Sequence, residues 1–274
     1  MLFLSHIPKP PLNEFVELFW FYDGFPPRAH KKERLMPDGS VELIINLRED
    51  EGRIYDRNNL AKFSRLPGTL LCGPHSNFFV IDTAEQNSVM GIHFKPGGAF
   101  PFFPLPVEEL HDQHVSLADL WGYEAVLLRE RLLEAATPQK KFQVLESCLM
   151  AQAFRPLEWH RAVGYALALF RNIHTAPAIS SVADQIGISS RRFIQLFSNQ
   201  TGLTPKLFCR VRRFQQALQH IHKGKEFDWV DVAGDCGYFD QAHFIHDFRE
   251  FSGMSPTTYL ALKTEHLNHV PIFE

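Results

Sequence analysis

Two kinds of hydrophobic pattern divide the chain, and the first consists of short apolar runs between turn residues. The clearest run is 40–47, which is rich in β-branched residues and follows the turn signal Pro37-Asp38-Gly39. Three further runs are 69–72, 78–81 and 88–94, the last of which closes at the turn 96–98. Several short strands separated by turns predict a small β-barrel or sandwich.

From residue 117 the pattern changes to that of helices. Residues 124–136 are rich in helix formers, and Thr137 with Pro138 is typical of an N-cap followed by the first helical position. The following stretch, to about residue 154, again has apolar residues at helical spacing. Both helices offer an apolar stripe, which either packs on the β domain or forms a dimer through a helical hairpin.

The last hundred or so residues contain an internal duplication. At an offset of 51, identical residues recur at four positions, and the neighbouring positions agree in type. The recurring pairs are Phe193 and Phe244, Phe197 and Phe248, Gly202 and Gly253, and Pro205 and Pro256. Ahead of these helices the offset is 50, so one residue has been gained in the second turn.

Each copy has the local signals of a helix-turn-helix. In the first copy, 181–186 predicts a short helix, Gly187 supplies the turn because glycine accepts a positive φ, and Ser189 caps a second helix. The second copy repeats this order with helices at 230–236 and 241–251. Gly237 and Asp240 are its turn and cap.

The segment between the copies sets their separation. Residues 205–222 predict one helix, which spans about 27 Å at about 1.5 Å per residue. This length is close to the roughly 34 Å between successive major grooves on one face of B-DNA. Its cations are Lys206, Arg210, Arg212 and Arg213. They suit phosphate contacts, although a solvated basic face explains them equally well.

The outward faces of the two second helices follow from their phenylalanines, which must point into the core. Opposite or beside them lie Arg191, Arg192, Ile194 and Gln195 in the first helix, and Ala242, His243, Ile245, His246 and Arg249 in the second. Arginine and glutamine bond to guanine and adenine edges in the major groove, while alanine and isoleucine contact thymine methyl groups. A solvated surface role is the alternative for any one residue, but the same arrangement of buried and outward-facing residues in both copies favours contact with DNA bases.

These motifs resemble the AraC/XylS-type DNA-binding domain, in which a long helix joins two helix-turn-helix units. The residues that carry the resemblance are Val182-Ala183, Gly187, Phe193, Phe197, Thr201-Gly-Leu-Thr-Pro205, Val232-Ala233, Gly237-Tyr238, Phe244, Phe248, Gly253-Met-Ser-Pro256 and Tyr259. The resemblance covers about 161–263 and implies a sequence-specific transcription regulator whose recognition helices enter adjacent major grooves.

Carried onto this sequence, the resemblance implies base-facing residues in both helices. They are Ser190, Arg191, Ile194 and Gln195 in the first and Gln241, Ala242, Ile245 and His246 in the second. Asp247 is a departure from the pattern, with Glu250 nearby, because an acid that faces the backbone repels phosphate. We therefore expect the first unit to carry more of the sequence readout.

The amino-terminal part is similar in general plan to the cupin-like β domains found on many such regulators. The segments that carry this resemblance are 35–46, 91–100 and 109–122. It implies an effector or dimerisation domain and names no ligand. Aromatic clusters such as Phe100, Phe102 and Phe103 either fill the core or line an apolar effector pocket.

Together these patterns predict an α+β protein in four parts. Residues 1–115 form a β-rich effector or dimerisation domain, the small barrel or sandwich. Residues 116–156 form a helical linker or dimerisation hairpin. Residues 157–264 form an all-α domain with two helix-turn-helix units, and residues 265–274 form a tail.

Composition narrows the class of nucleic-acid binder. The formal net charge is −3 and hydrophobic residues make up 45% of the chain, which excludes a polybasic or disordered binder. Residues 1–159 hold 16 Lys and Arg against 21 Asp and Glu, and residues 160–274 hold 12 against 10. The reading domain is only mildly basic, so we expect its affinity to depend on two reading helices and dimerisation more than on phosphate attraction.

The expected partners are a double-stranded DNA operator, a small-molecule effector, RNA polymerase if the protein is an activator, and a second copy of the chain. No stretch suits a signal peptide or a membrane span, so we expect a cytoplasmic protein with no membrane partner. The four cysteines form no CxxC pair and are expected to be buried thiols. We expect no cofactor, no metal site and no enzymatic activity.

The residues raise three alternatives. The first is a metal-dependent cupin-like enzyme, with Glu42, His75, Asp82 and His93 as possible ligands, although no His-x-His pair supports it. The second is alkylation repair, which requires clustered cysteine thiolates and a zinc site that the four dispersed cysteines cannot supply. The third is a constitutive DNA-binding protein whose β domain only dimerises.

Overall fold

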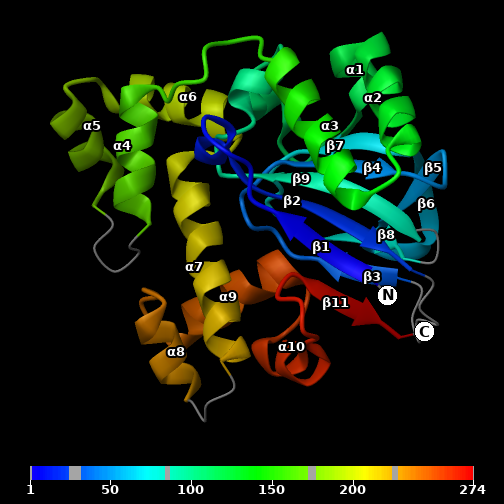
Figure 1. Ribbon diagram of the computed structural model, residues 1–274. Helices are drawn as coiled ribbons and strands as arrows, with labels where there is room; N and C mark the ends of the chain where they lie inside the picture. Colours follow the sequence, from blue (N-terminus) through cyan, green and yellow to red (C-terminus); the bar gives the residue numbers. More distant parts are fainter. Residues whose placement is uncertain (1, 25–31, 84–86, 172–176, 224–227, 274) are drawn as a thin grey trace.

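The computed structural model describes residues 2–24, 32–83, 87–171, 177–223 and 228–273. In Figure 1 the β-rich amino-terminal part lies to one side of a helical carboxy-terminal part, and one long helix runs along the boundary between them. The predicted α+β class is confirmed, with sandwich-like sheets in place of a closed barrel.

The amino-terminal strands form two antiparallel sheets. The first sheet has the order β1 (Leu2–His6), β2 (Val16–Asp23), β9 (Ser88–Phe94), β4 (Glu42–Asn46), β7 (Thr69–Cys72) and β10 (His114–Ser116). The second has the order β11 (His269–Ile272), β3 (Lys32–Leu35), β8 (Phe79–Asp82), β5 (Glu51–Asp56) and β6 (Asn59–Pro67). The runs predicted at 69–72 and 88–94 are therefore strands with the predicted limits.

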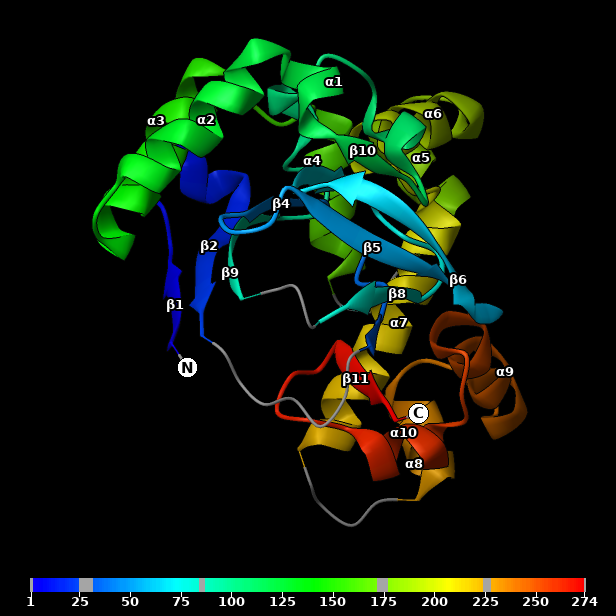
Figure 2. The same ribbon diagram turned by 90° about the vertical axis from the view of Figure 1, so that its right-hand side faces the viewer.

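Three helices cover one face of the first sheet: α1 (Leu117–Trp121), α2 (Tyr123–Glu134) and α3 (Pro138–Ala151) (Figures 1 and 2). Their apolar stripe, which includes Leu128 and Leu145, joins Phe19, Leu43 and Ile92 of the strands in one buried cluster. Of the two roles predicted for this stripe, packing on the β domain is the one that the structure shows. Three short 3-10 helices, η1 (Leu12–Glu14), η2 (Phe100–Phe102) and η3 (Val107–Leu110), complete this part.

Among the described residues of the carboxy-terminal part, seven α-helices are present. They are α4 (Arg161–Phe170), α5 (Ile179–Ile186), α6 (Ser190–Thr201), α7 (Pro205–His222), α8 (Trp229–Asp235), α9 (Gln241–Ser252) and α10 (Pro256–Leu262). Helix α7 is the predicted connector and contributes to both halves of the core. The Phe208 ring contacts that of Phe197 at 5.5 Å, and the Phe214 ring contacts that of Phe248 at 5.2 Å.

Residues 265–274, predicted as a tail, contain a strand that belongs to the amino-terminal part. Strand β11 pairs with β3, and His269 Nδ1 lies 2.9 Å from Glu33 Oε2. Sequence pattern alone gives little sign of this pairing because β11 is short, contains a proline and has its partner more than two hundred residues away. The segment that follows the helical part is therefore a strand of the second sheet, and the prediction of a simple tail is wrong for residues 269–272.

Candidate nucleic-acid interface

Helix α6 is built by local signals at both of its ends. Gly187 has φ +79° in the turn before it, and the Ser189 side chain accepts a hydrogen bond from the Arg192 backbone N–H at 3.3 Å. At the other end, Gly202 adopts the left-handed conformation that commonly terminates helices. These signals set where α6 begins and ends. Phe193 and Phe197, which are completely buried, fix the rotation of the helix about its axis.

The opposite side of α6 faces solvent. All five predicted contact residues are exposed: Ser190, Arg191, Arg192, Ile194 and Gln195. Two guanidinium groups and a carboxamide therefore lie along about one and a half turns of a rigidly held helix. These groups hydrogen-bond the acceptor-rich edges of guanine and the mixed edge of adenine.

Helix α9 repeats this construction. The Asp240 side chain accepts a hydrogen bond from the His243 backbone N–H at 2.7 Å, and Gly253 ends the helix in the left-handed conformation. Of the six predicted residues in this helix, Ala242, His246 and Arg249 are exposed, whereas Gln241, His243 and Ile245 are half-buried. The outer face of α9 thus presents fewer hydrogen-bonding groups than that of α6.

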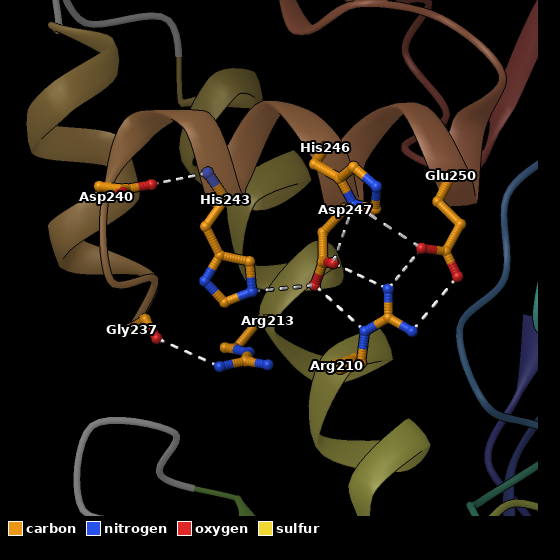
Figure 3. Close-up of polar contacts among 8 residues, drawn as sticks. All are labelled: Arg210, Arg213, Gly237, Asp240, His243, His246, Asp247 and Glu250. Atoms are coloured by element: carbon orange, nitrogen blue, oxygen red, sulfur yellow. Dashed lines mark hydrogen bonds and ion pairs between the residues drawn. The ribbon is translucent and has the colours of Figure 1, made fainter.

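The acidic residues of α9 are engaged within the domain (Figure 3). Arg210 of α7 donates from Nη2 to Asp247 Oδ1 at 2.8 Å and to Glu250 Oε2 at 2.6 Å. The hydrogen bonds that the guanidinium donates to Asp247 and to Glu250 raise its pKa, even though burial opposes this shift. Asp247 is only 2% exposed. We considered this acid as one that repels phosphate if it faced the DNA backbone, but it points inward and is neutralised by Arg210.

Two of the four cations predicted on α7 are occupied by internal contacts. Arg210 holds the acids of α9, and Arg213 donates to the Gly237 carbonyl at 3.3 Å while its guanidinium lies over the Tyr238 ring. Lys206 is exposed and Arg212 is half-buried. The continuous basic face suggested by the sequence is therefore divided, with Arg210 and Arg213 connecting α7 to the second helix-turn-helix unit.

The β-rich part contacts the ends of both α6 and α9. A Cβ placed at Gly202 would overlap Pro74, and one at Gly253 would overlap the ring of Phe78. In addition, the Phe78 backbone N–H donates to the Phe251 carbonyl at 2.9 Å. One loop of the β-rich part, residues 73–78, therefore touches the C-terminal end of each of these helices.

The four residues considered as ligands of a cupin-like metal site do not come together. His93 lies 3.7 Å from Glu42 and 3.5 Å from Asp38, and these acids raise its pKa to about 9 although burial alone would lower it. Asp82 instead accepts a hydrogen bond from Tyr55 at 2.9 Å in the second sheet. His75 instead pairs with Asp112, with His75 Nδ1 lying 3.5 Å from Asp112 Oδ1.

His75 belongs to a different cluster that the sequence analysis missed. A ligand atom from each of Cys72, His75 and His114 lies within 4.8 Å of the other two. The spacing Cys72-x-x-His75 was a usable signal for this cluster. The third residue lies on a separate strand and is brought in only by the pairing of β10 with β7.

The space between the two sheets is small. Its walls are mainly apolar, with Ile44, Leu70, Phe79 and Ile81 among them, and His114 and Asp82 add polar groups. The free volume of about 50 Å³ is far below the roughly 300–1,000 Å³ typical of pockets for organic ligands. In this conformation the cavity suits a water molecule or an ion better than a metabolite.

Two family models match separate parts of the chain. Residues 4–116 match a domain of unknown function (DUF6597), and residues 182–261 match a helix-turn-helix domain. The HTH-type transcriptional activator RhaS of Escherichia coli O157:H7 is 36% identical over 76 residues, which are 28% of this chain and 27% of RhaS. The carboxy-terminal domain is an AraC-type helix-turn-helix domain. The match covers about a quarter of the length of such curated relatives.

Solved structures give broader but weaker likenesses to this chain. ToxT from Vibrio cholerae aligns with a TM-score of 0.48 and 13% identity over 90% of this chain and 97% of ToxT. The DNA-binding domain of AdpA, solved in complex with a target DNA, aligns with a TM-score of 0.34 and 25% identity over 37% of this chain and 92% of that domain. Across the described residues, every helix is too short or too polar to cross a membrane.

Proposed function

We propose that the protein is a sequence-specific transcription regulator that reads a double-stranded DNA operator with α6 and α9. The observation that carries this proposal is that both copies of the duplication have the same arrangement of buried and exposed residues. In each copy a capped helix buries two phenylalanines and presents a solvent-exposed face opposite them. The match of residues 182–261 to a helix-turn-helix family supports the same role for these helices.

Under this proposal, some residues of each helix contact base edges and others contact the sides of the groove. In α6, Arg191 and Gln195 read base edges, while Ser190, Arg192 and Ile194 add contacts at the sides of the groove. In α9, the corresponding residues are Gln241, Ala242, His243, Ile245, His246 and Arg249. Since the exposed groups of α9 include fewer bidentate donors, α6 carries more of the sequence information.

The amino-terminal domain is proposed to regulate the reader, by a small-molecule effector or through dimerisation with a second copy. Its loop 73–78 contacts the ends of both reading helices, which supports a coupling between the two parts. If the regulator is an activator, it acts on RNA polymerase at the operator, and no catalytic step is assigned to the chain. With this function the protein works in the compartment that holds its DNA, the cytoplasm.

The test uses the full chain and an operator selected from a random DNA pool. Arg191→Ala/Gln195→Ala removes two bidentate contacts, each worth about 1–3 kcal/mol. The ratio of specific to non-specific affinity at fixed salt should therefore fall at least about 30-fold. The matched control is Arg131→Ala/Gln139→Ala, which removes the same two residue types from exposed positions on α2 and α3.

Two results would contradict the assignment. If the double variant in α6 retains the wild-type discrimination, this helix does not read the operator. If the control variant loses as much discrimination as the α6 variant, the effect is one of overall charge. Circular dichroism of both variants confirms that the substitutions leave the fold intact.

A further inference from the structure

Three potential ligand residues converge where the first sheet meets the loop that contacts the reading helices. Cys72 is the last residue of β7, and His75 follows three residues later in loop 73–78. His114 begins β10 and lies directly opposite Cys72 in the strand register. Residues opposite each other in neighbouring strands project from the same face, so the thiol and the imidazole of this pair share one side of the sheet.

The imidazoles in this cluster have buried nitrogens without partners. Among the residues that the structure describes, neither His75 Nε2 nor His114 Nε2 has a hydrogen-bond partner, and both atoms are inaccessible to solvent. The His75 residue is only 7% exposed. Buried polar groups are nearly always satisfied, so two orphaned nitrogens beside a thiol indicate a ligand that completes the cluster.

The other nitrogen of His75 faces a carboxylate. His75 Nδ1 lies 3.5 Å from Asp112 Oδ1, and Asp112 in turn accepts hydrogen bonds from the backbone N–H and the hydroxyl of Ser76, both at 2.6 Å. These contacts hold Asp112 at φ +56°, a conformation that is uncommon for a residue other than glycine. A histidine that ligates a metal through one nitrogen typically presents the other to such a carboxylate.

Burial affects both ligand types in this cluster. It lowers the pKa of His114 to about 3, with a smaller contribution from His75. Burial also raises the pKa of the Cys72 thiol, and the acids Glu42 and Asp38 add to this effect. A divalent cation that binds here must therefore displace the thiol proton.

We propose that Cys72, His75 and His114 bind one transition-metal ion of the zinc class, with a fourth coordination position open. One thiolate and two imidazoles favour zinc or its neighbours over magnesium or calcium, which prefer oxygen ligands. With Zn–S near 2.3 Å and Zn–N near 2.0–2.1 Å, tetrahedral ligand atoms lie about 3.3–3.6 Å apart. Small side-chain rotations bring the cluster from within 4.8 Å to that geometry.

The surroundings shield the site and connect it to the rest of the protein. The Phe79 ring packs against both imidazoles, with centroid distances of 4.4 Å to His75 and 4.8 Å to His114. Phe79 and His114 also line the small cavity between the sheets, where a fourth ligand fits. Loop 73–78 carries His75 between Pro74 and Phe78, which contact the ends of α6 and α9 respectively.

The experiment titrates Co²⁺ into the full-length protein after removal of metals with a chelator, in the absence of DNA. We expect one Co²⁺ per chain, with the visible absorption of a tetrahedral complex and a near-ultraviolet thiolate-to-cobalt band. Zn²⁺ should displace Co²⁺, whereas excess Mg²⁺ should not. Cys72→Ser should abolish the thiolate band, and His75→Ala or His114→Ala should weaken binding at least about tenfold.

Matched variants separate this site from other cysteines and histidines. Cys148→Ser removes another buried thiol, and His6→Ala removes a histidine on β1, so both should retain wild-type binding. Absence of a cobalt spectrum in the wild type, or a thiolate band that survives Cys72→Ser, would overturn the proposal. So would binding that is unchanged in both histidine variants.

A second measurement needs no variant and therefore does not depend on how the substitutions fold. A free thiol is mostly protonated near neutral pH and must lose its proton to ligate a metal, so Zn²⁺ should release protons on binding in weakly buffered solution. Binding of Zn²⁺ with no proton release would contradict ligation by Cys72. Both measurements are made without DNA, so their outcome is independent of the proposed operator binding.

Discussion

The two helix-turn-helix units share what holds a helix in place and differ in what the helix presents. Both α6 and α9 follow a glycine turn, begin at a side-chain cap and bury two phenylalanines completely. Their other faces differ, because α6 exposes two arginines and a glutamine while α9 places an acid inward against Arg210. Residues that determine the fold have thus been kept through the duplication, whereas the residues available for reading have diverged.

The largest effect is expected from substitutions that test whether the two helix-turn-helix units are held by equivalent core packing. Phe197→Ala and Phe248→Ala each remove a completely buried ring that packs against α7, so each should lower the free energy of unfolding by about 3–5 kcal/mol. Denaturation in urea measures both. Phe239→Ala is the matched control, because this side chain is 92% exposed and its loss should change stability by less than about 0.5 kcal/mol.

Similar losses in the two core variants support a common frame. A loss in only one of them would show that the units differ in their packing as well as in their surfaces. Such a result would limit the comparison to sequence pattern.

The next effect concerns the ion pair between Arg210 and Asp247. The first unit has a leucine, Leu196, at the position that matches Asp247. Arg210→Met removes both guanidinium hydrogen bonds to the buried Asp247 and leaves only His243 and His246 nearby, at 3.9 and 4.0 Å. It should lower the free energy of unfolding by about 2–3 kcal/mol, since breaking a buried ion pair is strongly unfavourable. Adding Asp247→Leu should recover most of that loss. Arg249→Met, on the exposed side of the same helix, should have little effect.

A full loss in the double variant would mean that Arg210 acts through its packing on Phe251 and not through the ion pair.

Features determined by residues close together in the chain could be predicted from the sequence. The caps Ser189 and Asp240 and the length of α7 depend on neighbouring residues, and all were predicted correctly.

Features made by distant residues were missed. The neutralisation of Asp247 requires an arginine 37 positions earlier in the chain, and no periodic pattern encodes that approach. The same holds for β11, which pairs with a strand near the other end of the chain, and for His114, which reaches Cys72 through strand pairing. Local conformational preferences were therefore readable from sequence, while contacts set by tertiary packing were not.

A smaller loss of stability is expected from Gly→Ala substitutions, which compare a glycine inside one unit with a glycine that contacts the β domain. Gly187→Ala strains a left-handed residue in open space and should cost about 1–2 kcal/mol. Gly202→Ala has a similar φ and in addition meets Pro74, so its loss of stability should be larger. Thermal and urea denaturation of the full chain give both values, and equal losses would show that the β domain moves away without cost.

The smallest effect concerns the helix caps. Ser189→Ala and Asp240→Ala each remove one hydrogen bond to an otherwise unsatisfied backbone N–H, which typically costs about 1 kcal/mol. The Asp240 carboxylate also interacts favourably with the positive end of the α9 dipole, so its loss should be slightly the larger at low salt. Repeating the urea denaturation at high salt should remove that difference. A difference that persists in high salt would mean that the two caps are not equivalent in geometry and that the duplication has diverged at the start of the reading helices too.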